Sequence, residues 1–214
     1  MRLILGSIFF ISLLFGEYEV DIDFSIDKTN PYLKEGVILD VNITQRDNSC
    51  VMFFKFSPKK SRDYSFKLLS FIENEEYHNL KHQYRYIIYP LKSGRVDLEF
   101  KFIKSITTDE KVAYAISGDR DNVKALSKQD IEVELDPIEL NVKKLPKGTN
   151  LVGDFSLSYK LDKNSSTPYE PIYLDIKLEG EGYLEKFDII KEKKDYTLFK
   201  QIKESDSGIY GSML

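Results

Sequence analysis

The sequence predicts an all-β protein made of antiparallel β-sandwich domains. The 214 residues include 14 Phe and 14 Tyr but only three Ala, a composition that favours strands over helices. Apolar and polar residues alternate through much of the chain, which places successive side chains on opposite faces of a sheet. Turn signals separate about eight such stretches between residues 18 and 144, a spacing typical of a sandwich.

Residues 1–16 are expected to be a signal peptide. Arg2 precedes the uncharged, apolar stretch 3–15, and Gly16 is a small residue at a plausible cleavage point. The apolar stretch is too short to span a bilayer comfortably, and no later stretch reaches the roughly 18 apolar residues that a span requires. We therefore expect export, and no transmembrane segment in the mature chain.

Residues 17–144 predict the first sandwich domain. Its expected strands are 18–26, 37–44, 51–56, 64–72, the two arms of 82–102, 111–116, 131–135 and 138–142. Residues 123–130 predict a short helix, and Pro137 breaks the last β stretch in two. The single cysteine, Cys50, cannot form an internal disulfide, and we expect it to be a small apolar residue on a strand.

Residues 82–102 predict a hairpin at the centre of this domain. Pro90 and Gly94 supply the turn between its two arms. The apolar face of the hairpin is expected to need a second sheet. The residues in alternating positions are Tyr84, Tyr86 and Ile88 in the first arm and Val96, Leu98, Phe100 and Phe102 in the second.

Residues 145–214 predict a second, shorter β domain after a linker at 143–153. Its expected strands are 154–161, 172–178, 183–190 and 196–202, followed by a polar tail. Four side chains align on one face of the first of these strands: Phe155, Leu157, Tyr159 and Leu161. About four strands are fewer than a complete sandwich needs, so we expect this domain to be incomplete and to leave sheet edges exposed.

The two domains are similar in sequence at one place. Residues 32–44 (YLKEGVILDVNIT) and 168–180 (PYEPIYLDIKLEG) share a tyrosine, an acidic residue and then an alternating strand. This similarity indicates tandem copies of one sandwich type.

The order of these motifs over residues 18–200 resembles the aerotolerance (Bat) protein family of BatD type. The residues that carry the resemblance are Tyr84, Tyr86, Pro90, Gly94, Pro146, Gly153, Phe155, Glu170, Gly180 and Gly182. The chain departs from the family at Tyr169 and Tyr183, where Gly and Asn are usual. Family members also usually continue through a completed second domain and a membrane anchor.

The resemblance implies tandem immunoglobulin-like domains in the periplasm and no catalytic activity. It also implies an accessory role beside membrane proteins with von Willebrand factor A domains and a MoxR-type ATPase, in oxygen tolerance or envelope stress.

Charge and motifs argue against several other functions. The net charge of −4 comes from interspersed acidic and basic residues, without the basic stripe that nucleic-acid binding usually needs. The sequence has no phosphate-binding loop or dinucleotide fingerprint, and its serines lack a matching histidine for a triad. Asp97 and Glu99 share the outer face of the hairpin, where solvation explains them. We predict no catalytic residue and no cofactor.

Two histidines form the best candidate for a metal site. His78 and His82 are four residues apart, with Glu75 and Glu76 just before them, and on a helix the two histidines would share a face. The segment leads directly into a strand, however, where four residues span about 13 Å, too far for one metal ion. We favour an exposed loop and predict no metal.

Two sequons are candidate glycosylation sites. Asn42 and Asn164 each precede Ser or Thr by two residues and follow Asp by two residues, a pattern that resembles the extended acceptor of bacterial N-glycosylation. Asn164 lies in a loop rich in Ser and Thr and is the better acceptor. Asn42 faces outward from a strand.

The sequence therefore favours a non-enzymatic, exported protein that acts through protein–protein contacts. Exposed sheet edges or aromatic strands would be its docking surface. The alternative is a ligand-binding or carbohydrate-binding sandwich in which tyrosines are stacking platforms. A flat, hydrophobic edge would favour the first hypothesis, and exposed tyrosines on a concave face the second.

Overall fold

The computed structural model describes residues 20–74, 76–116, 126–184, 197, 199–205 and 208–213, with only the backbone for residues 114 and 116 and for those from 200 on. The predicted signal peptide lies outside these residues. The chain divides into two compact units, Met1–Lys144 and Leu145–Leu214, which we call unit 1 and unit 2. No helix among the described residues is long and apolar enough to cross a membrane.

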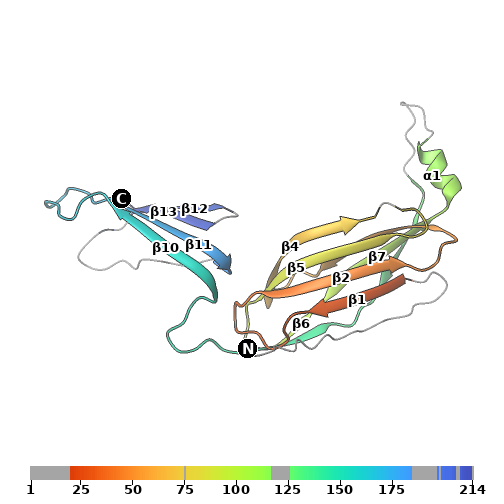
Figure 1. Ribbon diagram of the computed structural model, residues 1–214, viewed down its shortest axis with the longest axis horizontal. Helices are drawn as coiled ribbons and strands as arrows, with labels where there is room; N and C mark the ends of the chain where they lie inside the picture. Colours follow the sequence, from red (N-terminus) through yellow and green to blue (C-terminus); the bar gives the residue numbers. More distant parts are fainter. Residues whose placement is uncertain are drawn as a thin grey trace, which may run out of the picture. The chain divides into compact units, whose positions relative to one another are not determined.

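Unit 1 is a sandwich of antiparallel strands, as predicted (Figure 1). Its first layer is a four-stranded sheet. In spatial order the strands are β1 (Val20–Ile26), β2 (Val37–Gln45), β5 (Lys81–Pro90) and β4 (Tyr64–Glu73). Along β1 and β2, every second side chain is buried on the core-facing side and the side chains between them are more exposed, in agreement with the alternation of the sequence.

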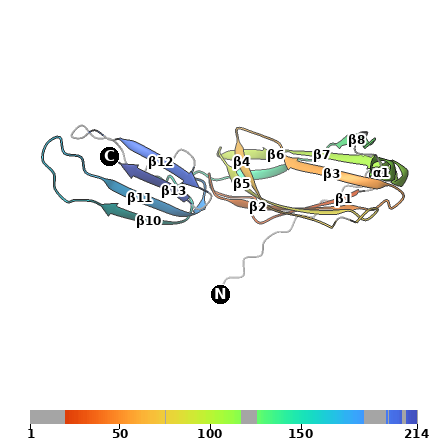
Figure 2. The same cartoon turned by 90° about the horizontal axis from the view of Figure 1, so that it is seen from above.

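The second layer lies across the core from the first (Figure 2). It contains β3 (Val51–Pro58), β6 (Gly94–Leu98), β7 (Phe100–Thr107), β8 (Gln129–Val133) and β9 (Ile138–Val142). β7 pairs with β3 and β8, while β6 pairs with β9. As predicted, Pro137 lies in the break between β8 and β9.

Aromatic rings from both layers meet in the core of unit 1. Phe24 of β1 lies 4.9 Å from Phe100 of the second layer, measured between ring centroids, and Phe56 stacks on Phe100 at 5.6 Å. Phe102 is fully buried. Cys50 directly precedes β3 rather than lying on a strand as predicted. It is buried in the same core, and burial raises the pKa of its thiol, in agreement with a packing role.

The predicted hairpin at 82–102 is wrong. Both sides of β5 are already occupied, by β2 and by β4, so β6 cannot pair with it. The chain instead crosses from one layer to the other between Pro90 and Gly94, and Gly94 has a φ of 95° where β6 begins. Alternation identified the buried face of each arm correctly, but it carries no information about which strand lies beside which.

Residues 111–116 are helical rather than extended. They belong to α1 (Asp109–Ile116). The hydroxyl of Thr108 accepts a hydrogen bond from the amide of Lys111, and Asp109 and Glu110 lie in the first turn, so this helix has a capped and electrostatically favourable start. The predicted helix at 123–130 is also wrong in its described part, because 126–128 are irregular and β8 begins at Gln129; residues 123–125 lie outside the described chain.

Unit 2 contains one antiparallel sheet among the described residues (Figure 1). In spatial order its strands are β10 (Gly153–Leu161), β11 (Leu174–Gly182), β13 (Gly208–Met213) and β12 (Lys200–Ser205). The predicted polar tail is therefore wrong at 208–213, which form β13. The predicted strand at 183–190 lies almost entirely outside the described residues.

Candidate functional site

A polar network closes the loop between β1 and β2 in unit 1. The amide of Ile38 donates to the Asp27 carboxylate at 2.9 Å, and the amide of Asp27 donates to the Ile38 carbonyl at 3.2 Å. Within the loop, Glu35 accepts hydrogen bonds from the Lys28 ammonium at 3.0 Å and from the Tyr32 amide at 2.7 Å. We call this arrangement the clasp.

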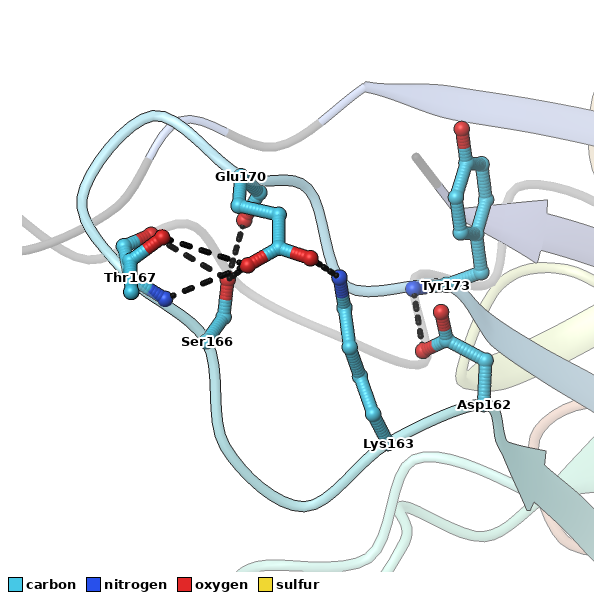
Figure 3. A network of polar contacts seen from close by, with 6 residues as sticks. All are labelled: Asp162, Lys163, Ser166, Thr167, Glu170 and Tyr173. Atoms are coloured by element: carbon cyan, nitrogen blue, oxygen red, sulfur yellow. Dashed lines mark hydrogen bonds and ion pairs between the residues drawn. The ribbon is translucent and has the colours of Figure 1, made fainter.

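The loop between β10 and β11 in unit 2 has the same clasp (Figure 3). The amide of Tyr173 donates to the Asp162 carboxylate at 2.8 Å, and the amide of Asp162 donates to the Tyr173 carbonyl at 3.0 Å. Glu170 accepts from the Lys163 ammonium at 2.6 Å and from the Thr167 amide at 3.4 Å. In both units the loop is thus held at its neck by an aspartate and across its middle by a lysine–glutamate pair.

The two clasps align residue by residue without a gap. Asp27 and Asp162 occupy the first position, and the lysine and glutamate of each clasp follow at the same distances along the chain. Even the backbone strain is repeated: Lys34 has a φ of 63° and its counterpart Tyr169 a φ of 71°. The strand register also matches, since Ile26 pairs with Leu39 as Leu161 pairs with Leu174.

The repeat extends to the whole sheet. The spatial order β1-β2-β5-β4 of unit 1 is reproduced by β10-β11-β13-β12 of unit 2, with the last two strands again joined in sequence as neighbours. Unit 2 therefore repeats the first layer of unit 1, which supports the prediction of tandem copies.

The glutamates of the two clasps are held in their charged form. Burial by itself would raise the pKa of Glu35, but the Tyr32 amide and the Lys28 ammonium lower it overall. The Lys163 ammonium and the Thr167 groups lower the pKa of Glu170. The charged carboxylate is part of the clasp in both units.

The two copies differ in what covers the core-facing row of the first strand. Ile22 and Phe24 of β1 are 2% and 7% exposed, because strands of the second layer lie over them. Their counterparts on β10, Leu157 and Tyr159, are 59% and 75% exposed. The row on β10 aligns on one face, as the sequence indicates, but Leu157 and Tyr159 are exposed in it.

We call Leu157, Tyr159 and Leu161 the open face of unit 2. The described strands of unit 2 are all counterparts of first-layer strands, so none corresponds to β6–β9 of unit 1. On β11 the same face is covered, since Ile176 and Leu178 are 7% and 4% exposed. The exposure is thus concentrated on β10, which forms one edge of the sheet.

A second apolar surface lies at the edge of the first layer of unit 1. β4 pairs only with β5 among the described strands, and its side chains are exposed from Lys67 to Glu73. The exposed apolar residues of this β4 edge are Leu68, Leu69, Phe71 and Ile72, at 45%, 48%, 43% and 60%. A bulge between Leu68 and Ser70 shifts the register.

His82 is buried on β5 beside the end of the β4 edge, so the expectation of an exposed loop is wrong for this histidine. Its Nδ1 lies 2.9 Å from the Tyr84 hydroxyl, and its Nε2 lies 3.1 Å from a carboxylate oxygen of Glu73, outside good hydrogen-bond geometry. Phe54 and Phe71 pack edge-on against the ring. Burial lowers the pKa of His82, and the nearby Glu73 partly offsets that effect.

The predicted pair of histidines is not brought together at one site. His78 contacts Asp109 at 2.9 Å, whereas His82 contacts Tyr84 and Glu73. Glu75 lies outside the described residues. Among the residues that are described, no three His, Cys, Asp or Glu side chains are grouped as metal ligands.

The family-like residues of unit 1 have structural positions. Tyr84 and Tyr86 are buried in the core, and burial raises the pKa of Tyr86 to about 12 and that of Tyr84 further. Neither ring is available as a stacking platform. Pro90 ends β5 and its carbonyl accepts a hydrogen bond from Lys34 in the clasp loop, while Gly94 begins β6.

The family-like residues of unit 2 lie around the base of the β10–β11 hairpin and in its clasp. Pro146 accepts a hydrogen bond from Thr149 in the turn before β10, and Glu170 belongs to the clasp. Gly153 pairs with Gly182, and the ring of Phe155 fills the space beside both. Gly180 pairs with Phe155 and has a φ of 145°.

Both sequon asparagines are exposed, in different settings. Asn42 lies on the outer face of β2, paired with Asp23 on one side and Gln83 on the other. Asn164 lies in the clasp loop of unit 2. There Asp162 closes the loop as Asp27 does in unit 1, and the Ser166 hydroxyl donates to the Glu170 carbonyl at 2.6 Å (Figure 3).

The clasp has a repeated motif in the sequence. At both positions an Asp-Lys pair is followed by a Glu seven residues after the Lys, and this Glu lies within the similar segments of the two domains. No family model matches the chain, and no curated protein matches it with significance.

Proposed function

We propose that this is a non-enzymatic, exported, BatD-like protein that acts through protein–protein contacts with envelope partners in oxygen tolerance or envelope stress. By family resemblance, the partners are membrane proteins with von Willebrand factor A domains. Both domains are immunoglobulin-like in this proposal, and the protein works in the periplasm, associated with the membrane through its partners.

The observation that carries this proposal is the open face of unit 2. Leu157 and Tyr159 are 59% and 75% exposed at positions whose counterparts in unit 1 form part of a core. Large contiguous apolar surfaces are typical of interaction sites in soluble domains. A partner that presents an apolar surface to β10 would gain hydrophobic stabilisation of the kind that Phe100 of β7 gives to Phe24 of β1 in unit 1.

A co-purification experiment tests this proposal. The exported chain is crosslinked in its native envelope, purified, and its partners are identified by mass spectrometry. Leu157→Lys is expected to lower partner recovery about tenfold, which corresponds to the loss of about 1.4 kcal/mol at a contact near the centre of the interface.

Ser156→Lys is the matched control, because it adds the same charge to the same strand on the opposite face, where Ser156 pairs with Glu179. We expect this variant to retain its partners. Equal recovery by wild type and Leu157→Lys would contradict the proposed use of the open face.

Exposed tyrosines favour a second candidate function, carbohydrate binding. Tyr169 at the tip of the clasp loop is fully exposed, and Tyr159 and Tyr173 are exposed on the same unit. Such rings can stack on sugars. Glycan co-purifying with the chain in place of protein partners, and lost in Tyr169→Ala, would support this alternative.

A further inference from the structure

We propose that the β4 edge binds a second copy of this chain, through antiparallel pairing of β4 with β4 about a two-fold axis. This surface belongs to unit 1 and is separate from the open face of unit 2. The proposal therefore stands or fails independently of the proposed function.

β4 is an edge strand of the first-layer sheet. β4 is ten residues long and lies at the end of its sheet, so one side of its backbone lacks a neighbouring strand among the described residues. Such an edge is a template for pairing with another chain. It carries four exposed apolar side chains: Leu68 and Phe71 are on the face of Tyr86 and Tyr84, Ile72 is on the opposite face, and Leu69 is at the bulge.

Exposed basic residues precede β4, and exposed acidic residues lie at its other end. The turn before the strand exposes Lys60 and Arg62, and the segment at its end exposes Glu73 and Glu76. In an antiparallel pair, the basic end of one copy lies beside the acidic end of the other. The ends thus attract at both extremities of the pair, whereas a parallel pair would bring like charges together.

The proposed pairing of β4 with β4 is symmetric about Leu68. A register that brings Lys60 of one copy near Glu76 of the other places Leu68 beside its own symmetry mate, because Leu68 is midway between them in sequence. The apolar residues then lie near the centre and the end charges at the rim, the arrangement of stable isologous interfaces. The same register places Asp63 opposite Glu73, a like-charge contact that Lys92 offsets through its ion pair with Asp63.

Two features of β4 restrict which partner can pair. The bulge at Leu69 interrupts the flat edge, and Lys67 places a charge along it. Natural sheets use bulges and edge lysines against indiscriminate association. A partner must accommodate both features, and an identical strand carries the complementary end charges to offset the cost.

The dimer would also change how the protein binds its partners. Two chains joined at β4 carry two open faces, and two linked sites can bind a multivalent target with higher avidity than one. A membrane array of partner proteins would then be held more tightly than a single partner.

Sedimentation or light scattering of the purified exported chain tests the proposal. We expect a dimer at low ionic strength that weakens with added salt, because the end charges are exposed and screened. Leu68→Lys should make it monomeric, whereas Leu157→Lys on unit 2 should leave the dimer intact.

Charge reversal gives the sharper test. In the first variant, Lys60→Glu with Arg62→Glu makes both ends of β4 acidic. In the second variant, Glu76→Lys weakens the acidic end. Glu73 is left in place in both because it contacts His82. Each variant alone should dimerise less than wild type, and an equimolar mixture should recover heterodimer. Circular dichroism checks that each variant is folded.

Two results would overturn the proposal. One is a wild-type chain that stays monomeric up to its solubility limit. The other is a dimer that resists Leu68→Lys or does not respond to the mixing of charge-reversed chains. A monomer that still captures envelope partners through Leu157 would overturn the dimer and leave the proposed function standing.

Discussion

At the scale of single residues, the buried ring of His82 couples the stability of unit 1 to pH. Burial lowers its pKa in the folded state below the ordinary 6.5, with Glu73 acting in the opposite direction. The unfolded chain therefore binds the proton more readily than the folded chain. Stability is highest above the unfolded pKa and is lost as the pH falls from about 6.5 toward the lowered folded pKa.

The corresponding prediction concerns His82→Gln. We expect wild-type unit 1 to lose free energy of unfolding between neutral and mildly acidic pH, and the variant to lose less over the same range. Urea unfolding at several pH values measures this, with His78→Gln as the control for removal of a histidine. An identical pH dependence in wild type and His82→Gln would show that His82 is not the coupled group.

A second residue-scale prediction concerns the sequons. Asn164 is exposed in a loop, whereas Asn42 lies in a strand paired on both sides, so only Asn164 is expected to accept a glycan from a lipid-linked donor. In a host with that machinery, Asn164→Gln should remove the added mass and Asn42→Gln should not. An unmodified intact mass for exported wild-type protein would contradict this.

At the scale of elements, the β10–β11 hairpin depends on a close approach at Gly180. A Cβ there would collide with the backbone carbonyl of Asp154, and the φ of 145° disfavours any L side chain. We expect Gly180→Ala to destabilise unit 2 by about 1–3 kcal/mol.

Gly94→Ala is the comparison, because Gly94 also has a positive φ but its added Cβ would meet no atom within 4 Å. Hydrogen exchange in β10 and β11 should rise in Gly180→Ala and stay unchanged in Gly94→Ala. Equal exchange in the two variants would mean that the close approach at Gly180 is unimportant.

The strands also show which parts of the fold could be predicted from the sequence alone. Alternation predicted the strands of the first layer and the buried faces of β1, β2 and β5, because burial on one side of a sheet imposes a period of two. It could not predict that β5 and β6 belong to different layers, since pairing depends on which edges are free. β13 was missed because its sequence, Gly208–Met213, alternates poorly and contains two glycines.

The candidate surfaces were harder to predict than the fold. Leu157 and Tyr159 alternate like Ile22 and Phe24, so the sequence implies burial for both pairs. Only the structure distinguishes the covered row from the exposed one. The clasp was accessible in principle, because its spacing is repeated, but its function as a closure required the hydrogen bonds.

At the scale of the whole molecule, the chain contains two copies of one sheet with different coverings. Unit 1 buries the core-facing row under a second layer, and unit 2 exposes the same row on β10. Our central claim is that this exposed row binds another protein. A β4-linked pair of chains would present it twice.

Site-specific photo-crosslinking tests this claim most directly. A photoreactive phenylalanine analogue is placed at Tyr159 or at its counterpart Phe24, in the full chain expressed in its native cells. The account predicts that position 159 crosslinks to a different protein, while position 24 crosslinks only within the chain, where Phe24 lies 4.9 Å from Phe100. Crosslinks from position 159 that stay within the chain, or that match those of position 24, would contradict it.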